Sequence, residues 1–178
     1  MTGAMDFSKW GINLAEMRSD RWPNAQRDAP TLEETWYRAV SINAPVQTVF
    51  RWICQLRAAP YSYDWIDNVG KPSPRYLIEG LDQLRVGQKV MRIFRVHEFS
   101  NDSFMTIVPW PPAKLFCSDL RITYRCAPAD TDQTRLLVRV QICYPKHPFR
   151  PIIRLLLPAG DLIMMRKQLF TLKQLCEQ

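Results

Sequence analysis

The sequence has few of the features that mark membrane proteins, secreted proteins or nucleotide-binding enzymes. It contains no run of roughly 18 apolar residues, which a membrane-spanning helix needs. Its first twenty residues lack the apolar core of a secretory signal. Its six glycines form no G-x-G-x-x-G pattern, so NAD, FAD and ATP are not expected as cofactors. The G-x-S-x-G pattern of a serine nucleophile is also absent.

Histidine and cysteine are too few and too scattered to predict a metal site. The two histidines, His97 and His147, have no H-x-x-x-H spacing, and the five cysteines include no C-x-x-C pair. An odd number of scattered cysteines predicts free thiols in a reducing compartment. We therefore expect a cytoplasmic protein with no metal and no cofactor.

Positive charge is abundant but dispersed. The net charge is +7, yet Lys and Arg are spread along the chain without a basic stripe interleaved with aromatic residues. No nucleic-acid partner is therefore predicted. The densest basic stretch, KHPFRPIIR, is equally apolar. With the leucines that follow, it predicts a transient contact with a membrane surface through Lys146–Leu157.

The spacing of apolar residues predicts one strand and two helices in the first part of the chain. Residues 36–43 are rich in apolar and β-branched side chains, which favour a strand. Pro45 suits the first turn of a helix, and the helical spacing after it predicts a helix over 46–57. A short second helix is expected within 63–69.

Strands separated by turn residues are expected throughout the region 88–144. Their predicted ranges are 88–99, 103–108, 114–127 and 134–144. In the last two ranges apolar and polar residues alternate, which indicates antiparallel strands with one buried face and one wet face. Such a sheet needs a cover over its apolar face.

An amphipathic segment at the C-terminal end can provide that cover. Its spacing predicts a helix over 161–176, with Gly160 breaking the chain before it and Asp161 as its N-cap. Gln168 falls inside the apolar arc, so it is either satisfied in the core or faces a cavity. The residues expected to be buried on the inward face are Leu162, Met165, Leu169 and Leu172.

The N-terminal residues predict an arm outside the main domain. Residues 1–35 space Trp10, Met17 and Trp22 among polar residues. This pattern fits either a strap that packs its tryptophans onto the domain or a lid or dimer arm. Residues 36–178 are expected to form one α+β domain, in which a curved antiparallel sheet wraps around the long C-terminal helix.

The order of elements, together with particular sequence words, resembles the START-like superfamily. This superfamily is also called polyketide cyclase/dehydrase-like or SRPBCC, and it has the helix-grip fold. The words are APVQTVFRWICQL after a strand, YSYDWIDN, GLDQLRVGQKV and the closing GDLIMMRKQLFTLKQL. The resemblance spans about residues 36–176 and is closest to a bacterial branch of small, mostly uncharacterised members. It implies a deep apolar cavity between sheet and helix, and it brings no catalytic set that can be matched residue by residue.

The best cluster of polar and aromatic groups lies in YSYDWIDN. There Asp64 could orient a ligand at the mouth of a pocket, or it could simply cap the short helix. Arg92 lies in the cavity if the even positions of strand 88–99 face inward, and on the surface if the odd positions do. The complete set of predicted ligand-binding residues is Tyr61, Tyr63, Asp64, Trp65, Trp110, Tyr124, Val140, Ile142, Met165, Gln168 and Leu169.

These observations lead to two hypotheses about function, with a membrane-surface carrier of a lipid or quinone as a third class. The first is a cytoplasmic binding protein for an apolar small molecule, such as a lipid, a polyketide or a quinone, held between sheet and helix. The alternative is a cofactor-independent enzyme of the cyclase/dehydratase kind that acts in the same cavity. An enzyme requires at least two polar side chains within hydrogen-bond reach of one bound molecule.

Overall fold

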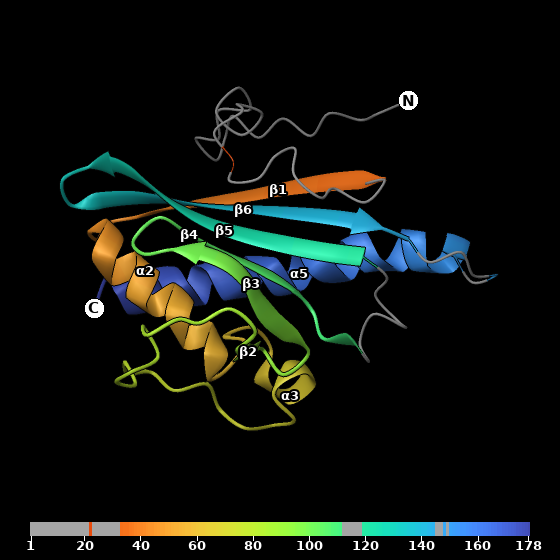
Figure 1. Cartoon of the computed structure of the whole chain (residues 1–178), viewed down its shortest axis with the longest axis horizontal. Coiled ribbons are helices and arrows are strands. Elements are labelled where there is room, and N and C mark those ends of the chain that lie inside the picture. The colour runs from red at the N-terminus through yellow and green to blue at the C-terminus, as the bar shows by residue number, and fades with distance from the viewer. Residues whose placement is uncertain (1–21, 23–32, 112–118, 145–147, 149) are drawn as a thin grey trace.

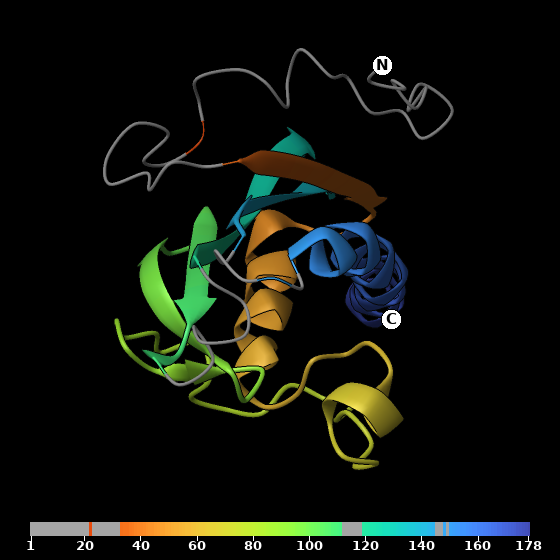
Figure 2. The ribbon, with the colours of Figure 1, turned by 90° about the vertical axis from the view of Figure 1, so that its right-hand side faces the viewer.

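Six antiparallel strands form one curved sheet, with two helices lying in its hollow (Figures 1 and 2). The computed structural model describes residues 22, 33–111, 119–144, 148 and 150–178. The strands follow one another across the sheet in the order β1-β6-β5-β4-β3-β2. The first strand therefore returns to pair with the last one. This arrangement confirms the predicted α+β fold, with a curved antiparallel sheet around a long C-terminal helix.

Most of the predicted elements are present, with shifts of a few residues at their ends. The strands are β1 (Glu34–Ile42), β2 (Lys89–Val90), β3 (Phe94–Ser100), β4 (Phe104–Pro109), β5 (Asp119–Asp130) and β6 (Gln133–Cys143). The helices are α2 (Val46–Cys54), continued by the 3-10 turn η2 (Gln55–Arg57), then α3 (Asp64–Asp67) and α5 (Arg150–Cys176). Residues 112–118, where the predicted strand 114–127 begins, lie outside the described residues.

The predicted strand 88–99 is wrong in one respect, because a turn divides it into β2 and β3. Met91 and Arg92 both have positive φ angles, 44° and 64°, a conformation that L-residues with long side chains rarely adopt. The amide of Ile93 donates to the carbonyl of Met91 at 2.7 Å and closes the turn. The turn breaks the alternation of faces, so Arg92 is exposed although Val90 and Phe94 on either side are buried.

The C-terminal helix α5 begins eleven residues before its predicted start, and this corrects the roles of Gly160 and Asp161. The helix runs through Pro158 and Gly160 without ending, so Asp161 lies in its interior and is not an N-cap. Ion pairs hold the early turns against the start of β1. Arg154 Nε donates to Glu34 Oε1 at 2.8 Å, and Arg150 pairs with Glu33. These tertiary contacts outweigh the local preference of proline and glycine to end a helix.

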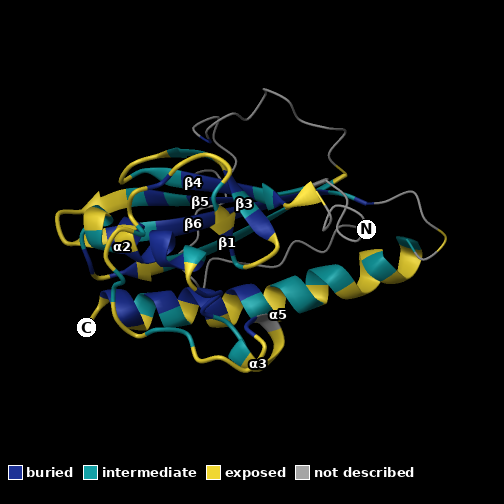
Figure 3. Ribbon diagram, turned by 60° about the horizontal axis from the view of Figure 1, so that its bottom comes forward, coloured by how far each residue is buried: buried dark blue, intermediate teal, exposed yellow. Residues whose placement is uncertain are grey.

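The two parts of α5 differ in burial (Figure 3). All of its buried residues lie in residues 165–176, here called the C-terminal segment, where Met165, Leu169 and Leu172 pack in the core as predicted. Residues 150–164, the N-terminal segment, contain no buried side chain. Leu162 is 41% exposed, so its predicted burial is wrong. No helix in the described part of the chain combines the length and the apolarity needed to cross a bilayer.

The inward and outward faces of β1 and β6 carry different partners. On the inward face, Val138 and Val140 join the core beneath α2 and α5. On the outward face, Trp22 packs against Tyr37 with ring centroids 5.9 Å apart, and the guanidinium of Arg139 lies 4.7 Å from its ring centre. Trp22 is the only residue before 33 that the structure describes, so the division into arm and domain stays a prediction.

Candidate ligand-binding cavity

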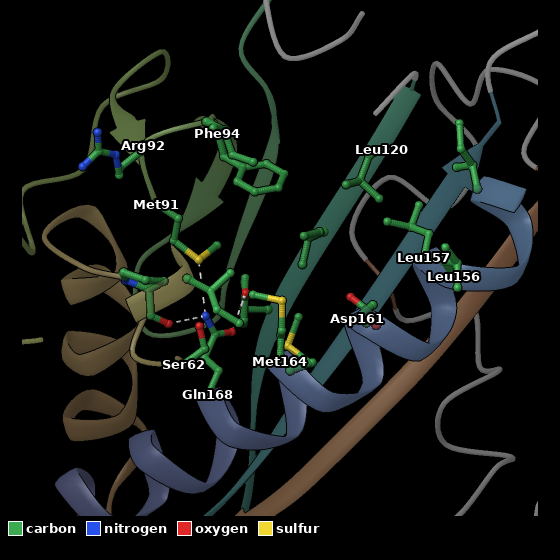
Figure 4. A pocket seen from close by; sticks show the side chains of 18 of the residues that line it. Ser62, Met91, Arg92, Phe94, Leu120, Leu156, Leu157, Asp161, Met164 and Gln168 are labelled. Atoms are coloured by element: carbon green, nitrogen blue, oxygen red, sulfur yellow. Dashed lines mark hydrogen bonds between the residues drawn. The ribbon is translucent and has the colours of Figure 1, made fainter. Parts of the chain in front are cut away.

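A cavity of about 850 Å³ lies between the sheet and the helix α5 (Figure 4). The residues that line it are mostly apolar and come from four parts of the fold. The sheet contributes Phe94 of β3 and Leu120, Ile122 and Tyr124 of β5. The side formed by α5 includes Ile153, Leu157, Gly160, Asp161, Met164, Met165 and Gln168. The remaining walls are the turn Met91–Ile93 and the segment around α3, with Pro60, Ser62, Ile66 and Val69.

Gly160 leaves open space on the helix wall. A Cβ atom built at this position would meet no heavy atom within 4 Å. Most positions facing a sheet in a packed core would offer much closer neighbours, because protein interiors are close-packed. Gly160 therefore marks a place where the helix and the sheet are not in direct contact.

A hydrogen-bonded group of side chains closes one end of the cavity. The buried Tyr124 hydroxyl donates to Gln168 Oε1 at 2.8 Å. Gln168 Nε2 donates in turn to the carbonyl of Pro60 at 2.6 Å and to the Met91 sulfur at 3.3 Å. Burial, and to a smaller degree the charge of Asp161, raises the pKa of Tyr124, so the hydroxyl stays protonated. Gln168 is thus both satisfied and on the cavity wall.

An ion pair lies farther along the same helix face. Arg38 Nη2 of β1 donates to Asp161 Oδ2 at 3.1 Å, and both side chains are about 15% exposed. Burial raises the pKa of Asp161, whereas the charge of Arg38 lowers it. The pKa of Arg38 is lowered by burial and raised by Asp161. Neither charge is well solvated, so each one depends on the other.

Three of the eleven predicted ligand-binding residues line this cavity, namely Tyr124, Met165 and Gln168. Their role in binding stays a prediction. Val140, Ile142 and Leu169 are buried, but they do not line it. Gln168 and Arg92 both line the cavity, which answers the two questions of placement that the sequence left open.

The aromatic cluster that the sequence singled out lies beside the cavity and does not line it. Tyr61 is buried against Trp52, with ring centroids 6.0 Å apart, and burial followed by Asp64 and Tyr76 raises its pKa to about 12. Asp64 accepts a hydrogen bond from the amide of Ser73 at 2.8 Å, so it fastens the following loop. The others are Tyr63, which is half-buried, Trp65, which is 74% exposed, and Trp110, which is 38% exposed beside Lys89.

The sequence interpretation missed the ion pair and most of the helix wall. Arg38 shares the inward face of β1 with Trp36 and Val40, and this parity was the available signal. Ile153 and Leu157 lie before the predicted helix start at 161, but they belong to α5. Among the described residues, no group of three or more His, Cys, Asp or Glu side chains is placed to hold a metal ion.

Comparisons with known proteins define the fold and little more. No protein-family model matches this sequence, and no curated protein matches it. A solved structure from Chromobacterium violaceum has 15% identity, a TM-score of 0.51 and coverage of 82% of this chain and 99% of its own. The di-domain ARO/CYC BexL from the BE-7585A biosynthetic pathway has 12% identity, a TM-score of 0.50 and coverage of 79% of this chain and 45% of its own. This chain has the START-like fold.

The resemblance that the sequence predicted is confirmed at the level of that fold. In this fold the helix gripped by the sheet is α5. The cavity occupies the part of the grip where helix and sheet separate, between β5 and the residues around Gly160. The geometry thus offers a largely apolar space, in which the Tyr124–Gln168 pair and Asp161 lie on the wall together with Ser62 and Arg92.

Proposed function

We propose that this protein binds an apolar small molecule in the cavity between the sheet and α5. The observation that carries the proposal is the cavity itself, whose volume of about 850 Å³ and largely apolar lining suit a ligand of drug-like or lipid-like size. The methionines Met91, Met164 and Met165 suit a wall that adapts to an irregular ligand. BexL, which shares the fold, is an ARO/CYC protein of a biosynthetic pathway, so a polyketide-like molecule is one of the ligand classes that we propose, beside lipids and quinones.

Binding fits the arrangement of polar groups better than catalysis by a cyclase or dehydratase does. Catalysis requires at least two polar groups within reach of the same reacting atoms. Asp161 and Gln168 lie two helical turns apart, roughly 10 Å along the axis. Gln168 and Tyr124 also use their hydrogen atoms on each other, Pro60 and Met91. The free thiols of Cys54, Cys126 and Cys176 support a reducing, cytoplasmic setting.

The direct test is to identify what the protein carries. The protein is purified from its own cells and its mass is measured under native and denaturing conditions, followed by solvent extraction and analysis of the extract. We expect an adduct of one apolar molecule per chain in the native spectrum. Gly160→Trp, which fills the cavity, serves as the control and should carry less of it. A wild-type protein with no adduct, or equal amounts on both proteins, would count against the proposal.

A membrane surface is the second partner that we propose, as the source or the destination of the ligand. The side of α5 that faces away from the cavity carries an exposed apolar stripe, which we define as Leu155, Ala159, Leu162 and Ile163. Exposed stripes of this kind on a basic helix are typical of contact with lipid. Exposed Arg166 and Lys167 lie near its end, and the net charge is +7, which suits an anionic bilayer.

Sedimentation with lipid vesicles tests this contact. We expect more protein on vesicles of phosphatidylcholine with phosphatidylglycerol than on phosphatidylcholine alone. Leu155→Asp should release it. Val86→Asp is the matched control, because Val86 is similarly exposed, at 68% against 75% for Leu155, and lies in the loop before β2. Equal binding of the two variants would contradict a role of the stripe.

A further inference from the structure

The polar groups of the cavity differ in whether a hydrogen-bonding position is still open. The Tyr124–Gln168 group has no hydrogen left to donate, because the hydroxyl of Tyr124 donates to Gln168 and both hydrogens of the Gln168 amide go to Pro60 and Met91. A ligand that accepts a hydrogen bond gains little there without breaking an existing bond. The acceptor positions that this group keeps are neutral oxygens.

Asp161 differs in that it offers a charged acceptor. Its Oδ2 accepts from Arg38, whereas its Oδ1 has no hydrogen-bond partner within the part of the chain that the structure describes. Figure 4 shows Asp161 on the face of α5 that turns toward the strands, one turn before Met164. An ionised carboxylate has only acceptor positions. Its free oxygen can therefore be met only by a group that donates a hydrogen.

Arg38 explains how a carboxylate persists beside an apolar cavity. It reaches Asp161 from the inward face of β1, and its Nη1 also donates to the carbonyl of Tyr37 at 2.9 Å. This second bond fixes the guanidinium, which leaves the pair in one geometry. A fixed ion pair with one free acceptor oxygen can set the orientation of a ligand in a largely apolar cavity.

We propose that Asp161 Oδ1 orients the ligand by accepting a hydrogen bond from a hydroxyl group. The occupant is then an apolar molecule with a phenol or alcohol at one end. A carboxylate group, such as that of a fatty acid, cannot take this position, because it has no hydrogen to donate and is repelled by the charge of Asp161. The inference rests on the proposed function, since it specifies the ligand class of that same cavity.

Three probes of nearly equal shape separate these ligand classes. They are 1-hydroxypyrene, which has a donor, 1-methoxypyrene, which has none, and pyrene-1-carboxylate, which is an anion. A hydrogen bond to a charged group predicts that 1-hydroxypyrene binds the wild type about tenfold more tightly than 1-methoxypyrene. We expect pyrene-1-carboxylate to bind the wild type more weakly than 1-hydroxypyrene does. Dissociation constants come from calorimetric titration at neutral pH.

Variants assign that preference to Asp161. Asp161→Asn should bring the two affinities within about threefold, because a neutral amide oxygen accepts more weakly than a carboxylate. Asp132→Asn is the matched control on the exposed β5–β6 hairpin and should keep the preference. The double variant Arg38→Leu/Asp161→Leu removes both charges together, which avoids an unpaired charge if the single variant fails to fold. This double variant should bind 1-hydroxypyrene and 1-methoxypyrene with equal affinity.

The outcomes distinguish this inference from the proposed function. If the wild type binds both neutral probes equally, or the folded double variant keeps the preference, the role of Asp161 is overturned while apolar binding stands. If neither probe binds the wild type, the proposed function fails as well. A preference that is present in the wild type and in Asp132→Asn, and absent in the double variant, supports both.

Discussion

The two segments of α5 belong to one helix but have different surroundings. The C-terminal segment, 165–176, packs against α2 and the sheet and holds all of the buried residues of the helix. The N-terminal segment, 150–164, is apolar on two sides, of which one lines the cavity and the other is the exposed stripe. An exposed apolar side of this kind is typical of a surface that contacts a partner. The difference indicates that the C-terminal segment holds the fold together, whereas the N-terminal segment is available for a ligand and a surface.

The largest difference between the two segments is expected in the free energy of unfolding, when a leucine is replaced by alanine in each of them. Leu172→Ala removes a fully buried side chain and should lower the free energy of unfolding by about 2 to 5 kcal/mol. Leu155→Ala changes a side chain that is 75% exposed and should change it by less than about 0.5 kcal/mol. Denaturant titration measures both. Equal losses would show that the N-terminal segment is packed as tightly as the rest.

The ion pair that joins the N-terminal segment to β1 should give the next largest effect. Arg38→Leu leaves Asp161 as an uncompensated charge near the apolar cavity, and we expect a loss of about 3 kcal/mol in the free energy of unfolding. Arg38→Leu/Asp161→Leu should recover most of that loss, because no charge remains to be compensated. If the double variant is no more stable than Arg38→Leu, the pair is not coupled as described.

The cost of Arg38→Leu should also depend on pH. Burial raises the pKa of Asp161 in the folded protein, so the fold binds this proton more tightly than the unfolded chain does. The tighter binding of this proton stabilises the fold. That contribution is fully present below the ordinary Asp pKa of about 3.9, and it is lost as the pH rises through the higher pKa of the folded protein. Without Arg38 the pKa rises further. The loss measured for Arg38→Leu should therefore be smaller at acidic pH than at neutral pH, and a larger loss in acid would reverse this assignment.

The only gain in stability is expected at Gly160. Gly160→Ala adds a methyl group where nothing lies within 4 Å. Alanine favours the helical conformation over glycine by about 1 kcal/mol, so the melting temperature should rise slightly. Gly80→Ala is a contrasting control, since Gly80 has a φ angle of 77° that strains any other residue. A loss of stability in Gly160→Ala would mean that the helix wall is closer to the sheet than described.

The sequence predicted those parts of the fold in which periodicity and burial agree. The inward positions of 134–144 and the helical spacing of Met165, Leu169 and Leu172 both correspond to buried faces. The outward face of 134–144 was expected to be wet, and this is wrong at Arg139 and Gln141, which are buried. Prediction failed where tertiary contacts decide. Gly160 and Asp161 have the residue types of a helix start, yet Arg38 and Glu34 hold the helix across them from a strand more than 100 residues away in the chain.

The candidate site was predicted less well than the fold for a related reason. Gln168 could be identified because it is polar within an apolar stripe. Arg38 showed the same signal, between Trp36 and Val40, but on a strand whose register was not known in advance. The turn at Met91 and Arg92 contains no glycine or proline, so the sequence gives no signal for it. Its positive φ angles go with a tertiary contact, the 2.9 Å hydrogen bond from the Met91 amide to the Leu56 carbonyl.

The central claim is that the space beside the N-terminal segment of α5 binds one apolar molecule. Titration with N-phenyl-1-naphthylamine, a neutral fluorescent probe, tests it most directly, with fluorescence and thermal melting measured for three proteins. We expect saturable one-to-one binding by the wild type and by Leu155→Trp, which places an indole on the exposed side of the helix. Gly160→Trp, whose indole enters the open space, should remain folded and lose binding. No saturable binding by the wild type, or unchanged binding by folded Gly160→Trp, would contradict the account.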